Sequence, residues 1–202
     1  MKEVTFMNNT LDYYNENATA FVEGTKDVDF KQTQDRFIQK LNDNSKILDF
    51  GCGSGRDSKY FMEKGFIVDA VDGSKEICKI ASEYLGIEVK QMLFQQLNAK
   101  EEYDGIWACS SILHLTYDEL IDVIFNMMEA LKQNGIIYTS FKYGEFEGFR
   151  NGRYFINFNE EKFEQLLNKI NGLEIEELWI SGDVREGRGD ERWLNLILRK
   201  KN

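Results

Sequence analysis

The sequence predicts an α/β fold in three layers, with a mostly parallel β-sheet between two layers of helices. Short apolar runs alternate with amphipathic stretches five times between residues 28 and 141, and this alternation is typical of parallel strands joined by right-handed helical crossovers. The first apolar run ends in the glycine-rich turn ILDFGCGSG at 47–55, as expected where a buried strand leads into a helix. Two strand-like runs, 173–180 and 192–199, close the chain.

Composition is that of an ordinary globular protein. The 202 residues suit one domain with a large core. A net charge of −10 argues against unspecific binding to nucleic acid or to an anionic membrane. No apolar stretch approaches the roughly 20 residues that span a bilayer, and the first residues lack the apolar core of a signal peptide. We therefore expect a cytoplasmic protein that does not contact membranes.

Three cysteines, without a C-x-x-C pair, indicate neither a disulfide framework nor a zinc site. We expect Cys52, Cys78 and Cys109 to be small buried side chains and expect no metal.

Five strands are expected from apolar runs that end in glycine, aspartate or polar clusters. They are 46–50, 66–72, 87–92, 101–109 and 136–141. Helices are expected where apolar residues recur at helical spacing, at 28–41, 54–64, 75–85, 117–132 and 159–171, with a shorter one at 9–22.

Capping residues support these boundaries. Ser74 and Asn159 are suitable N-caps, and Thr116 with Glu119 forms a capping box. Gly65 and Gly86 end the helices that precede them.

The spacing of the glycines decides which nucleotide the turn suits. The pattern is Asp49-x-Gly51-x-Gly53-x-Gly55, whereas the dinucleotide pattern G-x-G-x-x-G would need glycine at Arg56 or Ser58. The turn also lacks the Lys and Ser or Thr of a triphosphate loop. It closely resembles motif I of class I S-adenosylmethionine-dependent methyltransferases. That resemblance implies that Asp49, Gly51, Cys52, Gly53 and Gly55 hold S-adenosylmethionine.

Asp72 ends the second predicted strand, 21 positions after Gly51. A carboxylate at this spacing can accept hydrogen bonds from both ribose hydroxyls, and Gly73 follows it. Asp69 is the competitor, but it lies inside the strand.

The adenine side departs from the family pattern. The position that commonly carries an aspartate for the adenine amine is Leu93 here. Backbone groups of Leu93 and Phe94, the Phe94 ring, or a side-chain amide of Gln95 or Gln96 remain as alternatives.

The resemblance covers the layout of residues from about 28 to 199, including the aromatic-Asp start of the fourth strand at Tyr103, and we expect residues 28–202 to form a single methyltransferase domain. It implies a seven-stranded sheet that ends in an antiparallel pair. In many small-molecule members a segment like Tyr13–Ala18 lies over the cofactor. Residues 1–27 are thus either such a lid, with Tyr14 at the cofactor, or a frayed arm.

Other side chains expected at the site follow the later strands. Ser110 and His114 follow the fourth strand, and we expect Ser110 to contact the cofactor and His114, the only histidine, to act as base or orienter. Asp183 is a second candidate base. Aromatic and cationic residues in two long loops are expected to bind the acceptor, since arginine suits carboxylate or phosphate groups. They are Lys142, Tyr143, Arg153, Tyr154, Trp179, Arg185 and Arg188.

The sequence thus predicts S-adenosylmethionine-dependent methyl transfer to a small acceptor, which can be anionic. Oxygen, nitrogen, sulfur and a metalloid all remain open as the accepting atom. A nucleic-acid acceptor is disfavoured by the charge and by the lack of an N-P-P-[YF] motif. The alternative is a non-catalytic S-adenosylmethionine-binding sensor or partner subunit. We expect a monomer or a dimer.

Overall fold

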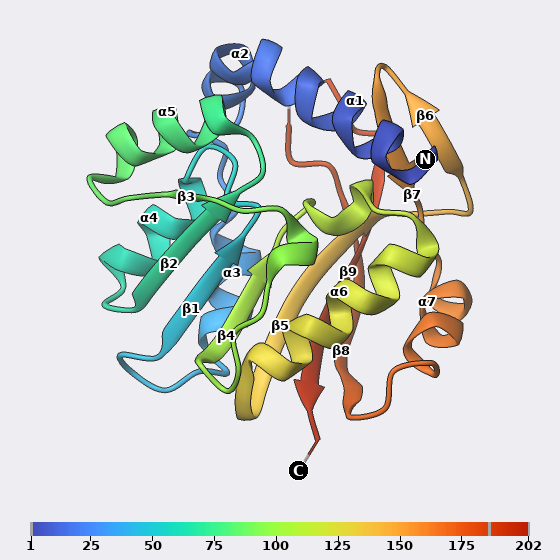
Figure 1. The fold of residues 1–202 in the computed structure, drawn as a ribbon. Helices are drawn as coiled ribbons and strands as arrows, with labels where there is room; N and C mark the ends of the chain where they lie inside the picture. The colour runs from blue at the N-terminus through green and yellow to red at the C-terminus, as the bar shows by residue number, and fades with distance from the viewer. Residues whose placement is uncertain (1, 186, 202) are drawn as a thin grey trace.

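A computed structural model of the protein describes residues 2–185 and 187–201. A seven-stranded sheet crosses the molecule in the order β3-β2-β1-β4-β5-β9-β8 (Figure 1). Strands β1 to β5 run parallel, and β9 is antiparallel to both β5 and β8. This confirms the predicted fold. The strands are β1 Lys46–Phe50, β2 Ile67–Asp72, β3 Lys90–Gln91, β4 Tyr103–Ala108, β5 Leu131–Lys142, β8 Leu173–Gly182 and β9 Arg192–Lys200.

Helices cover both faces of the sheet and divide the core in two. On one face, Phe37 and Phe61 of α3 and α4 pack on Trp107 and Tyr138. On the other, apolar residues of α6 and α7, such as Phe163, pack on alternate residues of the same strands. The bounds are α3 Lys31–Ile38, α4 Arg56–Glu63, α5 Lys75–Leu85, α6 Tyr117–Ala130 and α7 Glu160–Leu167.

The predicted caps are confirmed, whereas several helix and strand ends differ. Ser74 accepts the backbone N–H of Ile77, Asn159 accepts that of Lys162, and Thr116 forms the capping box with Glu119. The helices expected to reach 132 and 171 end at 130 and 167, and the expected strand 87–92 keeps only two residues. Helix α6 ends earlier than expected because β5 begins directly after it, and the first residue of β5 already pairs with β4.

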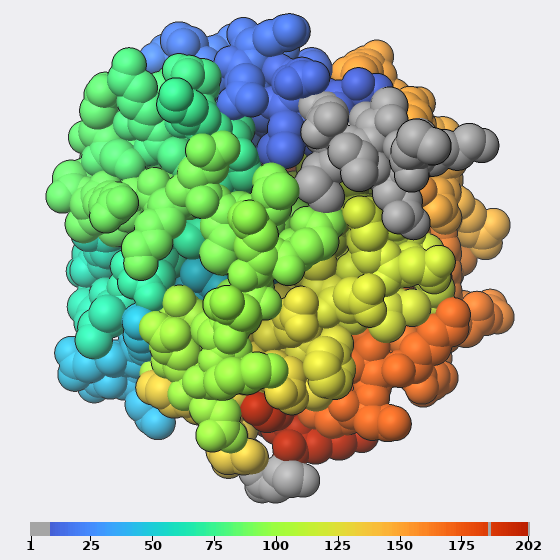
Figure 2. All heavy atoms as spheres, viewed as in Figure 1, coloured from blue at the N-terminus to red at the C-terminus, as the bar shows by residue number. Residues whose placement is uncertain are grey.

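The N-terminal segment forms two helices, α1 Lys2–Glu16 and α2 Ala18–Glu23, where one short helix was expected. Helix α1 lies across the end of the sheet and contacts α5 at one end and β7 at the other (Figure 1). In the space-filling view the blue N-terminal atoms adjoin both the green α5 region and the orange hairpin (Figure 2).

The segment after β5 was expected to be a long loop, and this is wrong. It contains the hairpin β6 Glu147–Arg150 and β7 Arg153–Ile156. Asn151 and Gly152 form its turn with φ of 49° and 78°, the conformation for which an Asn-Gly pair is favoured. The hairpin places β7 beneath α1.

Within residues 2–185 and 187–201, we find no helix both long and apolar enough to cross a bilayer.

A buried carboxylate joins three elements on the α3–α4 side. Asp57 accepts hydrogen bonds from Gln34 Nε2 at 2.6 Å, from Trp107 Nε1 at 2.8 Å and from both ends of the Arg56 guanidinium. Each of these donors would lose its partner without the carboxylate, and an unpaired buried donor is costly.

We predict that Asp57→Ala lowers the free energy of unfolding by about 3 kcal/mol, because it strands two buried donors and one buried cation. Urea denaturation measures the loss. The control is Asp122→Ala, an exposed aspartate of α6, which should change stability by less than about 0.5 kcal/mol. Equal losses of stability in Asp57→Ala and Asp122→Ala would show that the Asp57 carboxylate does not hold these elements together.

Candidate active site

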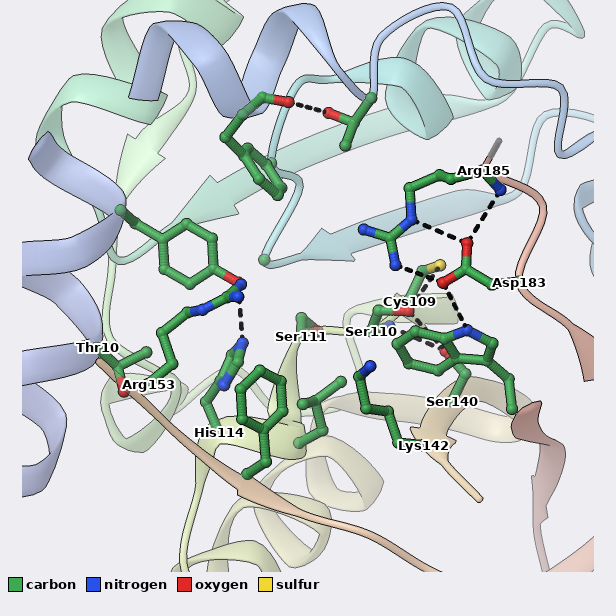
Figure 3. A pocket seen from close by; sticks show the side chains of 18 of the residues that line it. Thr10, Cys109, Ser110, Ser111, His114, Ser140, Lys142, Arg153, Asp183 and Arg185 are labelled. Atoms are coloured by element: carbon green, nitrogen blue, oxygen red, sulfur yellow. Dashed lines mark hydrogen bonds and ion pairs between the residues drawn. The ribbon is translucent and has the colours of Figure 1, made fainter. Parts of the chain in front are cut away.

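A cavity of about 810 Å³ opens at the carboxyl ends of the parallel strands, where ligands bind in open α/β sheets. Its floor is formed by the residues that follow β1, β2 and β4 and by the end of β5. Helix α1, strand β7 and the turn between β8 and β9 form its walls (Figure 3).

The glycine turn takes a conformation that only glycine adopts easily. Gly51, Gly53 and Gly55 have φ of 84°, 54° and 80°. A Cβ on Gly51 would lie 2.5 Å from the Cβ of Ser111, so a larger residue would not fit. Gly51, Cys52 and Gly53 line the cavity, with the Phe21 ring against Gly53.

Asp72 lies at the end of β2 and lines the cavity together with Gly73. One carboxylate oxygen accepts the Gly53 N–H at 3.0 Å and the other the Ser74 N–H at 2.9 Å. Burial raises the pKa of Asp72, and the N–H groups of Ser74, Gly53 and Gly73 oppose that rise. Each oxygen keeps room for one more hydrogen bond, as a ribose diol requires.

Apolar residues line the cavity beyond Asp72, among them Leu93 and Phe94, whose ring packs edge-on against Phe50. The Leu93 N–H already donates to Gln96 Oε1 at 2.8 Å, so this backbone donor is occupied. Gln95 lines the cavity and its amide donates to Glu119.

His114 sits at the end of a short 3₁₀ helix, Ile112–His114, on the cavity wall. Its Nδ1 lies 2.6 Å from the carbonyl oxygen of Tyr154, and its Nε2 lies 2.9 Å from Tyr14 Oη. Burial lowers the pKa of His114 to about 4, and the positive charges of Arg153 and Lys142 act in the same direction. The imidazole is therefore neutral near pH 7.

Asp183 lines the cavity, and neighbouring donors already occupy its carboxylate. Its carboxylate accepts the backbone N–H and Nε of Arg185 at 3.0 and 2.9 Å, and Trp193 Nε1 at 3.1 Å. Burial acts to raise the pKa of Asp183, but the hydrogen bonds from Arg185 outweigh it and lower the pKa to about 2. The carboxylate of Asp183 therefore holds Arg185 in place.

Most cations on the wall are neutralised by an acidic partner. Lys142 pairs with Glu191, Arg185 with Asp183, and Arg56 with Asp57. Arg188 lies 3.7 Å from Glu191. Their charge is thus balanced inside the protein.

Arg153 of β7 is not balanced in this way, because no carboxylate among the described side chains pairs with it, and the same holds for Arg150 and Arg192 of the cavity lining. Its Nη1 lies 3.3 Å from Tyr14 Oη, its guanidinium carbon lies 4.3 Å above the Tyr13 ring, and its buried Nε has no hydrogen-bond partner in the described part of the chain.

Four predicted residues lie outside the cavity lining. Asp49 is buried beneath the turn, where it accepts from Ser58 Oγ at 2.6 Å, and Gly55 packs against Leu85. The Tyr154 hydroxyl points to Glu147 at 2.6 Å. Trp179 stacks under Arg36, further from the cavity on the same face of the sheet, and Trp193 of β9 lines the cavity instead.

All other predicted site residues line the cavity, namely Tyr14, Gly51, Cys52, Gly53, Asp72, Gly73, Leu93, Phe94, Ser110, His114, Lys142, Tyr143, Arg153, Asp183, Arg185 and Arg188. The hydroxyl of Tyr143 is held by Glu160.

Sequence reasoning missed Phe155, Trp193 and Ser140 on the cavity wall. The backbone N–H of Ser110 donates to Ser140 Oγ at 2.9 Å. Ser110 has a φ of 52°, unusual for a residue other than glycine and typical of functional sites. The Asn-Gly turn at 151–152 was the signal that could have placed Phe155 on a strand.

Comparison with known proteins agrees with the geometry. Residues 47–135 match the model of a methyltransferase domain family. YqeM of Bacillus subtilis (strain 168), a methyltransferase by name, is 31% identical over 117 residues, 52% of this chain and 47% of that protein. N-terminal Xaa-Pro-Lys N-methyltransferase 1 of Bos taurus is 33% identical over 107 residues, 49% of this chain and 48% of that protein. The chain therefore spans about half the length of these curated relatives.

Among solved structures, the 1,6-didemethyltoxoflavin-N1-methyltransferase of Burkholderia thailandensis superposes with a TM-score of 0.81 at 18% identity, over 99% of this chain and 91% of that one. It is described with bound 1,6-didemethyltoxoflavin and S-adenosylhomocysteine. Sheet order and superposition show the class I methyltransferase fold, and the match of residues 47–135 to a methyltransferase domain agrees with the glycine turn.

We predict that Asp183→Asn destabilises the protein by about 1–2 kcal/mol at pH 7, discounted for screening by water in the cavity. The pKa of Asp183 is about 2 in the folded chain and its ordinary value is 3.8. Its contribution is therefore complete above about pH 4 and is lost as the pH falls through about 2.

Urea unfolding of both proteins at pH 7 and pH 3 tests this, and the difference between them should shrink at pH 3. Asp190→Asn, an exposed aspartate of the same turn, is the control and should have little effect at either pH. A difference independent of pH would contradict the ion pair.

Proposed function

We propose that the protein transfers the methyl group of S-adenosylmethionine to a small anionic acceptor. One observation carries the proposal: a single cavity joins the Asp72 and glycine-turn site to Arg153, a cation without a carboxylate partner among the described residues. The end of the cavity at Asp72 and the glycine turn suits a nucleoside, and the end at Arg153 suits an anion.

The residues present fit the cofactor. Asp72 has one unused acceptor position on each oxygen, the bare backbone of Gly51 and Gly53 permits close approach, and Leu93 and Phe94 offer an apolar surface for a purine. We infer that Asp72 holds the ribose and that the purine lies against Phe94. A volume of about 810 Å³ leaves room for a second small molecule.

The bound cofactor supplies a methyl group that its sulfonium already activates. The chain's residues then have to hold the acceptor atom in line, roughly 3 Å from that methyl group, and exclude water. Helix α1 serves the second purpose, because Tyr14 and Leu11 line the cavity from above and the Leu11 side chain lies against Gly73.

Arg153 is the residue that we expect to recognise the acceptor. An arginine fork binds carboxylates or related anions with good geometry, and the rings of Phe155 and Trp193 beside the cavity can contact a planar molecule. The Burkholderia neighbour, described with bound 1,6-didemethyltoxoflavin, also favours a small acceptor.

A protein N-terminus is the second candidate acceptor, because the Bos taurus relative is an N-terminal N-methyltransferase by name. Such an amine is a cation when protonated, and Arg153 would repel it. A sensor without turnover is the remaining alternative, and measured methyl transfer excludes it.

We predict that Asp72→Ala weakens S-adenosylhomocysteine binding by about 1–3 kcal/mol, because charged hydrogen bonds to the ribose are lost. Calorimetric titration measures this. Asp69→Ala is the matched control, since Asp69 lies on the same strand but pairs with Lys46 and Tyr103 outside the cavity. The Asp69→Ala variant should bind S-adenosylhomocysteine as tightly as the wild type. Unchanged affinity in Asp72→Ala would exclude Asp72 as the ribose ligand, and no binding to the wild type would overturn the proposed function.

We further predict methyl transfer to anionic aromatic acceptors, assayed with labelled S-adenosylmethionine on 2-hydroxy-, 2-amino- and 2-mercaptobenzoate. The matching neutral benzamides should react at least about tenfold more slowly, a factor that one charged hydrogen bond can supply. Arg153→Met should remove this preference. The control is Arg36→Met, an arginine that also stacks on an aromatic ring but outside the cavity.

Equal rates for acids and amides, or a preference for an N-terminal peptide amine, would show that the acceptor class is wrong while leaving the cofactor assignment intact.

A further inference from the structure

Tyr14, His114 and the Tyr154 carbonyl form one hydrogen-bonded chain at the cavity wall. Figure 3 shows the His114 ring on this wall, close to the Arg153 side chain. A carbonyl oxygen can only accept a hydrogen bond, so Nδ1 of His114 must carry the ring hydrogen that is donated to Tyr154. In the neutral ring the Nε2 is then a bare acceptor. It follows that the Tyr14 hydroxyl donates to Nε2 across the 2.9 Å separation.

The other side of the Tyr14 oxygen faces the cavity, which Tyr14 lines. Arg153 Nη1, at 3.3 Å, uses one of the two lone pairs of Oη. The second lone pair remains for a donor in the cavity. The oxygen is thus placed to receive a hydrogen bond from an acceptor while its own hydrogen points at His114.

We propose that Tyr14 and His114 form a proton relay, in which Tyr14 Oη takes the proton of the acceptor and His114 Nε2 takes the proton of Tyr14. This inference rests on the proposed methyl transfer and adds the route by which the proton leaves.

The atoms and charges balance. The acceptor atom X of an X–H group forms a bond to the methyl carbon, the carbon–sulfur bond breaks, and its electron pair returns to sulfur. The X–H proton moves to Tyr14 Oη as the phenol proton moves to Nε2. The positive charge of the sulfonium ends on the imidazolium, whose Nδ1–H still donates to the Tyr154 carbonyl.

A weakly basic histidine is sufficient for this step. An acceptor that has attacked as neutral X–H carries a strongly acidic proton once it is methylated. The side chains that face the His114 ring are Tyr14 and Phe155, with the charges of Arg153 and Lys142 nearby. Because these positive charges disfavour the imidazolium, His114 releases its extra proton to solvent readily after the product has left.

The relay requires helix α1 in its observed position. Asn15 Oδ1, one residue after Tyr14, accepts the Ser74 hydroxyl at 2.7 Å, and Thr10 Oγ1 accepts the Tyr154 N–H at 3.2 Å. These contacts fix Tyr14 over His114. The base is therefore completed by a residue from a different part of the chain.

The first test uses nitrogen NMR on the single histidine of the S-adenosylhomocysteine-loaded protein. We expect the Nδ1–H tautomer and a titration midpoint near pH 4. Tyr14→Phe should move the Nε2 signal towards that of a free ring nitrogen and raise the midpoint, since the hydroxyl no longer competes with protonation. Tyr13→Phe, which removes the neighbouring hydroxyl of the same helix, should change neither.

The second test compares turnover on whichever benzoate reacts. Tyr14→Phe and His114→Gln should each lower kcat by about 10²-fold or more without weakening S-adenosylhomocysteine binding. The double variant should lose no more than the worse single one, as for residues that act as a unit. The loss should be smallest for 2-mercaptobenzoate, whose thiol is the most acidic of the three groups.

An Nε2–H tautomer, or an Nε2 signal that Tyr14→Phe leaves unchanged, would overturn the relay even if no benzoate reacts. Normal kcat in Tyr14→Phe would reduce Tyr14 to a positioning role and also overturn it. Failure of S-adenosylhomocysteine binding would instead reject the proposed function, so the two failures are distinguishable.

Discussion

The carboxylate of Asp72 is the constraint on which the arrangement of the site depends. It accepts the N–H of Gly53 in the turn after β1 and that of Ser74 at the start of α5, and so ties two neighbouring crossovers together. Ser74 also donates its hydroxyl to Asn15 of α1. The position of α1, and with it the contact of Tyr14 with His114, therefore follows from the same buried group that we assign to the ribose.

Local patterns were enough to predict the parts of the fold that depend on local physics. The parallel strands, the glycine turn, the caps at Ser74 and Thr116 and the place of Asp72 follow from periodicity, φ preferences and strand ends. The hairpin at 147–156 has an equally local signal in Asn151-Gly152, but the surrounding cations and aromatic residues resemble an irregular loop. The hairpin was not predicted because the composition of the segment was given more weight than its Asn-Gly turn.

Other features depend on long-range pairing, which no local pattern reveals. Which tryptophan lines the cavity is set by strand register, which pairs Trp193 with Lys142 at the cavity end of β5 and Trp179 with Asn195. Both rings lie on the same face of the sheet, but Trp179 lies further from the cavity along the strands, so Trp193 and not Trp179 lines the site. Likewise, the sequence places Asp183 and Arg185 in one turn but does not show that they form an ion pair, which the structure reveals.

The charges of the cavity link the acceptor to the base. Lys142, Arg185 and Arg56 are balanced by Glu191, Asp183 and Asp57, whereas Arg153 has no carboxylate partner among the described side chains, so a ligand can neutralise its charge. Arg153 is also one of the charges that lower the pKa of His114. An anion bound to Arg153 offsets that charge and raises the pKa of His114. In the proposed relay, an anionic acceptor would therefore make His114 a stronger base by binding to Arg153, whereas a neutral acceptor would bind more weakly and leave His114 a weaker base.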